Sequence, residues 1–126
     1  MPRRRVCVIT GTRAEYGLLQ WVMHDLRAAP DIELQVIATG SHLSPEFGMT
    51  VDQIERDGFE VTRRVEMLLS SDTAGGIAKS MALGLIGLSD ALEQLRPDVA
   101  LVLGDRYEIL AAAQACLLHQ IGRAHV

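Results

Sequence analysis

The segment that decides the fold runs from Val6 to Gly17 and reads V-C-V-I-T-G-T-R-A-E-Y-G. Its first five residues are apolar or β-branched without interruption, which is typical of a strand buried on both faces of a sheet. Gly11 ends that strand. Thr12 and Glu15 then have the spacing of a helix capping box, so the segment predicts a strand followed directly by a helix.

The same unit of strand and helix recurs along the rest of the chain. After Pro30 has ended the first helix, we expect strands and helices in alternation over residues 33–39, 50–56, 59–65, 71–95, 98–103 and 106–119, with a fifth strand opening at 121. This order indicates an α/β protein with a doubly wound parallel sheet.

The expected helix over 71–95 contains four glycines. A glycine inside a helix costs about 1 kcal/mol relative to alanine. We therefore expect close packing against a neighbouring element, or a bend, at Gly75, Gly76, Gly84 and Gly87. The residues that open this helix, 70–73, read as a helix cap, with a phosphate-facing loop as the alternative.

Composition excludes several classes of protein. The chain has 126 residues, 48% of them hydrophobic and 22% charged, which fits one globular domain. Its net charge is -4 and its basic residues cluster only at 3–5, so we expect no nucleic-acid partner. No apolar run approaches the ~20 residues that cross a bilayer, so we expect no membrane partner and a cytoplasmic protein. Cys7 and Cys116 fall in apolar runs and read as reduced core residues, and the histidines lack metal-ligand spacing.

Polar residues follow three of the expected strands where those strands end. Ligands of doubly wound parallel sheets bind outside the carboxyl ends of the strands. The turn after the first strand is neither a G-x-G-x-x-G nor a Walker loop, so we expect no cofactor. Arg13, in the first turn of the helix, suits a phosphate or carboxylate. The alternative is a solvated surface arginine beside a Thr12 cap.

The other two strand ends carry His42 and Asp105. The imidazole of His42 is suited to donate to a sugar hydroxyl or a phosphate, with an ordinary surface histidine as the alternative. Asp105 follows Gly104 and is itself followed by Arg106 and Glu108. Because Asp-x-x-Glu is also a capping pattern, the alternative for Asp105 is the N-cap of the next helix.

Taken together, four motifs resemble the hydrolysing UDP-N-acetylglucosamine 2-epimerases. They are G-T-R-A-E-Y-G from Gly11, T-G-S-H-L-S-P-E-F-G from Thr39, V-E-M-L-L-S-S-D-T from Val65 and L-G-D-R-Y-E-I-L-A-A-A from Leu103. The resemblance implies a glycosyltransferase-B-type fold of two Rossmann-like halves, of which residues 1–120 form the N-terminal one. It further implies that the nucleotide-binding second half is absent from this chain.

The resemblance also implies roles for matched residues. Asp105 corresponds to the family's catalytic acid and His42 to its sugar-side histidine, so the resemblance implies that both are catalytic. Arg13 corresponds to the substrate-facing arginine, with Arg106 and Glu108 in supporting substrate-binding roles. The implied reaction removes the C2 proton of a UDP-N-acetylhexosamine, releases UDP and adds water to give an N-acetylmannosamine-type sugar for sialic-acid-like biosynthesis. We expect this partial chain to be inactive by itself and the full-length protein to be a homo-oligomer.

The last six residues depart from the family pattern. The family continues into a strand ending in His-x-Gly-Gly-Glu, whereas this chain reads I-G-R-A-H-V over 121–126. Glycine weakens a strand and an unpaired buried arginine is costly. One reading frame of a common sequencing adapter encodes the same hexapeptide followed by a stop. We therefore expect residues 121–126 to be a non-native tail.

Two alternative functions stay open. The first is another enzyme of the same fold, either a non-hydrolysing epimerase or a glycosyltransferase, which differs in whether free UDP appears as a product. The second is a stand-alone flavodoxin-like binding module such as a receiver domain. Receivers carry acidic residues at the end of the first strand, where this chain has Thr10, Gly11 and Thr12.

Overall fold

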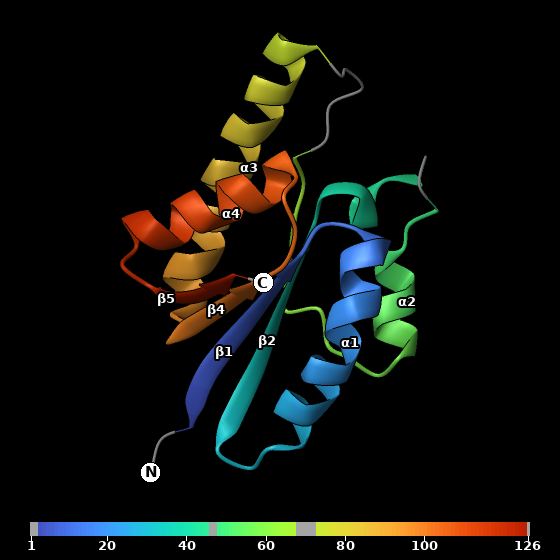
Figure 1. Cartoon of the computed structure of the whole chain (residues 1–126), viewed down its shortest axis with the longest axis vertical. Helices are drawn as coiled ribbons and strands as arrows, with labels where there is room; N and C mark the ends of the chain where they lie inside the picture. The colour runs from blue at the N-terminus through green and yellow to red at the C-terminus, as the bar shows by residue number, and fades with distance from the viewer. Residues whose placement is uncertain (1–2, 46–47, 68–72, 126) are drawn as a thin grey trace.

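The computed structural model of the chain describes residues 3–45, 48–67 and 73–125. It forms a five-stranded parallel sheet in the order β3-β2-β1-β4-β5 (Figure 1). The strands are β1 Arg4–Thr10, β2 Ile32–Thr39, β3 Arg63–Val65, β4 Val99–Val102 and β5 Gly122–His125. The helices are α1 Arg13–Ala28, α2 Val51–Arg56, α3 Ala74–Leu95 and α4 Tyr107–Leu118, with a 3-10 turn η1 at Gly40–Leu43. The predicted doubly wound parallel sheet is confirmed.

The helices form a layer on each face of the sheet. Figure 1 shows α1 and α2 on one side and α3 and α4 on the other. Because successive side chains of a strand point to opposite faces, Val8 of β1 packs with Leu19 and Met23 of α1, while Cys7 and Ile9 pack toward α3 and α4. Both faces of β1 are therefore buried from Cys7 to Thr10, which explains the apolar run that ends this strand.

Two glycines of α3 let the helix approach the segment that contains β3. A Cβ on Gly87 would lie 2.7 Å from Cγ1 of Val65, and one on Gly84 would lie 3.1 Å from the Cβ of Met67. The expected close packing is confirmed at these two positions. Close packing is not the reason for Gly75, where a Cβ would meet no heavy atom within 4 Å among the residues that the structure describes, so a bend stays the expectation there.

The starts of β3 and α3 can be compared with the boundaries expected from the sequence. The strand expected over 59–65 is only Arg63–Val65, because Thr62 pairs with β2 partly through its side chain, whose Oγ1 accepts the Val36 N–H at 3.0 Å. Thr73 caps α3, since its Oγ1 accepts the Gly76 N–H at 3.1 Å. The cap reading is thus confirmed at Thr73, while residues 70–72 lie outside the described part of the chain. The origin of residues 121–126 stays a prediction, although Gly122–His125 pair with β4.

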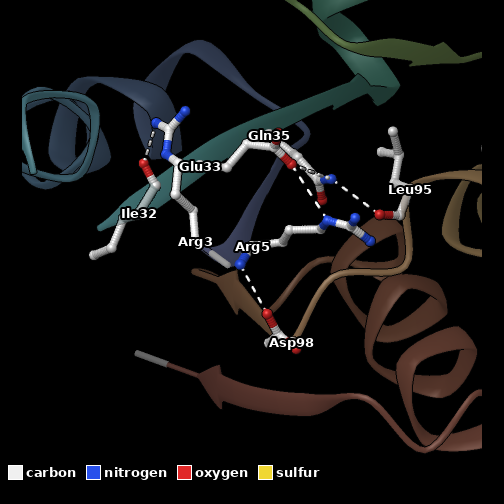
Figure 2. A network of polar contacts seen from close by, with 7 residues as sticks. All are labelled: Arg3, Arg5, Ile32, Glu33, Gln35, Leu95 and Asp98. Atoms are coloured by element: carbon white, nitrogen blue, oxygen red, sulfur yellow. Dashed lines mark hydrogen bonds and ion pairs between the residues drawn. The ribbon is translucent and has the colours of Figure 1, made fainter. Parts of the chain in front are cut away.

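The amino ends of the strands are held by a polar network (Figure 2). The Arg5 N–H donates to Oδ2 of Asp98 at 2.8 Å, and its guanidinium lies 3.5 Å from Glu33. Gln35 donates to the Leu95 carbonyl at 3.0 Å. These contacts join β1, β2 and the turn before β4, so Arg5, Glu33 and Asp98 have structural partners at this end of the sheet.

Within the described ranges, no helix has the length and apolar character needed to cross a lipid bilayer.

Candidate functional site

A pocket of about 290 Å³ lies where β1, β2 and β4 end. Its walls come from the start of α1, from η1, from the residue before α2 and from the β4–α4 connection, namely Thr12, Arg13, Ala14, Ser41, Thr50, Arg106 and Glu108. The chain proceeds from β1 to β2 on one side and later crosses to β4 on the other, so this is the switch point of the sheet. Such points are where doubly wound sheets bind ligands.

Arg13 stands at the amino end of α1, on the wall of this pocket. The Thr12 hydroxyl caps the helix by accepting the Glu15 N–H at 3.2 Å, as expected for Thr12. Arg13 itself is exposed, but it lines the pocket in the first turn of α1. A cation and the positive end of a 16-residue helix together favour an anion here.

Two buried carboxyl groups underlie the pocket. Glu15 is 7% exposed, and its Oε1 accepts the Gly11 N–H at 2.9 Å, one residue earlier than in a capping box. Glu108 is 2% exposed, and its Oε1 lies 3.2 Å from Nε of Arg106. The other oxygen of Glu108, Oε2, is buried without a partner among the residues that the structure describes.

Glycines at the three strand ends leave room for these carboxyl groups. A Cβ on Gly11 would lie 2.6 Å from Cγ of Glu108, and one on Gly104 would lie 2.6 Å from Oε2 of Glu15. Gly40 has φ +62° and a Cβ there would lie 2.8 Å from the Gly11 carbonyl oxygen. The sequence predicted Glu15 only as half of a capping box, and Gly104, the glycine at the end of β4, is the signal for its second role.

The pKa of the Glu15 carboxyl group depends on its surroundings. Burial raises the pKa of Glu15, and the negative charge of Glu108 raises it further, against the hydrogen bond from Gly11, which lowers it. Glu15 thus holds a proton more readily than a carboxyl group in water.

His42 lies beneath the pocket and is fully buried. Its Nε2 is 2.9 Å from Oγ1 of Thr10, and its Nδ1 is 2.9 Å from Oγ1 of Thr50, which lines the pocket. Desolvation by burial lowers the pKa of His42 to about 4, so the ring is neutral at pH 7. The alternative of an ordinary surface histidine is therefore wrong.

Asp105 is exposed on the loop between β4 and α4 and is not among the residues that line the pocket. The N-cap position of α4 is Arg106, so the alternative of an Asp105 cap is wrong. Of the five predicted site residues, Arg13, Arg106 and Glu108 meet at the pocket. His42 supports it from below, and Asp105 lies at the same end of the sheet, one residue from Arg106.

Across residues 3–45, 48–67 and 73–125, the structure contains no group of three or more histidine, cysteine or acidic side chains suited to hold a metal ion. Cys7 and Cys116 are buried thiols that are not joined in a disulfide. Burial raises the pKa of the Cys7 thiol, followed by the effect of the nearby Cys116.

Comparisons with known proteins agree with this arrangement. A family model described as UDP-N-acetylglucosamine 2-epimerase matches residues 24–126. The chain is 44% identical over its whole length to the Campylobacter jejuni "GDP/UDP-N,N'-diacetylbacillosamine 2-epimerase (hydrolyzing)", and covers 33% of that protein. It is 33% identical over 98% of its length to the Escherichia coli "Polysialic acid biosynthesis protein P7", and covers 32% of it.

A solved structure has the same fold. The Neisseria meningitidis UDP-GlcNAc 2-epimerase, crystallised bound to UDP-GlcNAc, matches with a TM-score of 0.80 and 22% identity, over 97% of this chain and 31% of that one. The chain thus spans about a third of the length of the curated relatives it matches.

Proposed function

Since the chain belongs to the UDP-N-acetylglucosamine 2-epimerase family, we propose that it supplies the sugar- and phosphate-facing wall of a hydrolysing 2-epimerase. The enzyme converts a UDP-activated 2-acetamido sugar into the free 2-epimer and UDP. The observation that carries the proposal is the meeting of two arginines and one buried carboxyl group, Arg13, Arg106 and Glu108, in one pocket at the switch point. The Campylobacter relative, whose name includes the word hydrolyzing, supports release of the nucleotide rather than its return to the sugar.

The proposed reaction needs charge stabilisation at the leaving group. A base takes the proton from C2, the electron pair of that C–H bond forms the C1=C2 double bond, and the C1–O bond breaks toward UDP. Water then adds across the double bond, with hydrogen at C2 and hydroxyl at C1. Cations and helix amides stabilise the charge that develops on the departing diphosphate. We assign this role to Arg13, the first turn of α1 and Arg106.

Asp105 and His42 have different places in the proposal. Asp105 is the proton carrier, as the family resemblance implies, and its solvent-exposed loop lets it approach a sugar held at the pocket. His42 has both ring nitrogens within hydrogen-bond distance of threonine hydroxyls, so it acts as a positioning residue that holds Thr50 at the pocket wall.

Two sugars are candidates for the substrate. The name of the Campylobacter relative favours UDP-N,N'-diacetylbacillosamine. The Escherichia coli relative, named for polysialic acid biosynthesis, favours UDP-N-acetylglucosamine and an N-acetylmannosamine product. Either product serves the synthesis of sialic-acid-like sugars. We place the enzyme in the cytoplasm as a homo-oligomer. The homo-oligomer is supported by exposed leucine and isoleucine side chains on α3 and α4. These are Leu83, Ile86, Leu110 and Leu117, all at least 46% exposed.

The test joins this chain to the remaining two thirds of the Campylobacter relative and supplies each UDP-sugar in D₂O. We expect release of free UDP together with a 2-epimer that carries deuterium at C2. Sugar that stays attached to UDP would identify a non-hydrolysing epimerase, and transfer to an acceptor would identify a glycosyltransferase. The chain by itself serves as the control and should give no turnover.

A further inference from the structure

We propose that Glu108 is the sugar-recognition residue of this pocket, with its Oε2 accepting a hydrogen bond from a hydroxyl or amide N–H of a phosphorylated 2-acetamido sugar. Its Oε1 meanwhile holds Arg106 at the phosphate. This inference rests on the proposed function and deepens it, because it assigns one atom of the pocket to the sugar rather than to the diphosphate.

The Glu108 carboxyl group is buried, and only one of its oxygens has a partner among the described residues. The side chain is 2% exposed and lines the pocket, with Oε1 beside the Arg106 guanidinium at 3.2 Å. Oε2 has no hydrogen-bond partner among the described residues. A buried carboxylate oxygen left unpaired is unfavourable by the full desolvation cost of the group. A donor on a bound ligand removes that cost.

Glu15, the other buried carboxyl group at the strand ends, differs from Glu108 in its contacts. Glu15 already accepts the Gly11 N–H at 2.9 Å and does not line the pocket. It therefore has a structural role at the strand ends. Glu108 is the carboxyl group that lines the pocket, so a bound ligand can donate the hydrogen bond that its Oε2 is able to accept.

Two glycines hold the Glu108 side chain in place. The Cγ of Glu108 lies 2.6 Å from the Cβ position of Gly11 and 3.4 Å from that of Gly40. The two glycines thus form a slot that fits the side chain closely. An acceptor fixed before binding loses little conformational freedom when the ligand arrives, which favours affinity.

The side chains that line the pocket carry charges of both signs. Arg13 and Arg106 suit an anionic phosphate, whereas the Glu108 carboxylate repels an anion and attracts hydroxyl and amide donors. A phosphorylated 2-acetamido sugar carries both kinds of group in one molecule. Inorganic phosphate carries the anion without a neighbouring sugar hydroxyl, so the pocket should discriminate between the two.

The experiment compares two ligands on the chain itself. The ¹⁵N,¹³C-labelled chain is titrated with N-acetylglucosamine 1-phosphate and, separately, with inorganic phosphate, and both dissociation constants are measured by NMR. We expect the sugar phosphate to bind about tenfold more tightly, the value of one hydrogen bond to a charged group. In Glu108→Gln this preference should disappear while phosphate binding is retained. Glu60→Gln, the same change at an exposed position, should alter neither constant.

A wild-type measurement needs no substitution. The ¹³Cδ resonance of Glu108 should shift on addition of the sugar phosphate and not on addition of phosphate. The proposal is overturned if Glu108→Gln weakens the binding of both ligands equally or of neither. It is also overturned if the wild-type chain binds neither ligand or does not prefer the sugar phosphate. If Glu108→Gln does not fold, the ¹³Cδ shift decides alone.

The two proposals fail separately. A chain with the expected preference, joined to an enzyme that releases no UDP, would refute the proposed function and leave the sugar contact standing. If the joined enzyme is active but the Glu108→Gln chain keeps its preference for the sugar phosphate, the sugar contact is refuted and the proposed function stands.

Discussion

The Oε2 atom of Glu15 lies 2.6 Å from the position that a Cβ on Gly104 would occupy. Glu15 belongs to the helix that follows β1, yet its carboxyl group lies against the end of β4. Glu108 belongs to the helix that follows β4, yet it lies against Gly11 and Gly40 at the ends of β1 and β2. Each carboxyl group therefore lies against the end of a strand other than the one that its own helix follows. This exchange of positions sets the spacing of the loops around the pocket.

Replacing Gly104 should displace the Glu15 carboxyl group from the end of β4. Gly104→Ala introduces a Cβ at φ +117° and against Glu15, so we expect the free energy of unfolding to fall by about 2 kcal/mol or more. Urea denaturation measures the change. Gly17→Ala is the matched control, because a Cβ there meets no atom within 4 Å and alanine is the better helix residue. It should stabilise the chain by up to about 1 kcal/mol. Equal effects of the two substitutions would contradict the crowding at Gly104.

The glycines of α3 should differ among themselves. Gly87→Ala meets the β-branched side chain of Val65 at 2.7 Å, which has little freedom to move, so we expect a loss of about 1–3 kcal/mol. Gly84→Ala meets the flexible side chain of Met67 and should cost less. Gly75→Ala, in open space, is the control and should not destabilise the chain. Thermal or urea unfolding gives the order, and a Gly75→Ala loss as large as that of Gly87→Ala would refute the packing explanation.

Much of this architecture was predictable from sequence because the signals are local. The apolar run before Gly11 and the cap at Thr12 fix a strand and a helix from a dozen consecutive residues. The alternation of such units then determines a parallel sheet. The strand expected over 59–65 was less accurate, because the side chain of Thr62 does part of the pairing that a main chain would otherwise do.

The site was harder to predict because its contacts join distant residues. Sequence motifs identified Arg13, Arg106 and Glu108, and the pocket brings these three together. They could not show that Glu15 is buried under Gly104, or that His42 lies between two threonines. Burial of a polar side chain depends on which loops meet over it, and that information is tertiary.

Stability should depend on pH through His42. Its pKa is lowered to about 4 in the folded chain from an ordinary 6.5, so the unfolded chain binds the proton more readily. The contribution is complete above pH 6.5 and is lost as the pH falls toward 4, by at most about 3 kcal/mol. Urea unfolding of the wild type and of His42→Gln across this range measures it. The slope in this window should be shallower in the variant, and identical slopes would contradict a neutral buried imidazole.

Glu15 should give a dependence of the opposite sign. Its pKa is raised by burial and by Glu108, so the folded chain resists ionisation of this group and loses stability as the pH rises through the raised pKa. The stability of Glu15→Gln relative to the wild type should therefore increase between pH 4 and pH 7. Direct titration of the Glu15 ¹³Cδ resonance provides the check, and a midpoint at or below the ordinary glutamate value would exclude the effect.

In the joined enzyme, Asp105→Asn should lower turnover by at least about 100-fold, the usual effect of removing a positioned proton carrier. The UDP-release assay described above measures it. Asp31→Asn makes the same chemical change at an exposed position before β2, at the opposite end of the sheet, and should leave turnover unchanged. Turnover close to wild type in Asp105→Asn would remove Asp105 from the mechanism.

The position of β1 in the middle of the sheet has a consequence for biosynthesis. β1 is translated early, and it pairs on one edge with β2, which follows soon after, but on its other edge with Val99–Val102 of β4. Until the ribosome has released β4, that apolar edge has no neighbour and is open to pairing with another nascent chain. Polypeptides that stop before β4 should therefore aggregate, whereas extension through α4 should yield the first species that a chaperone can release in a native state.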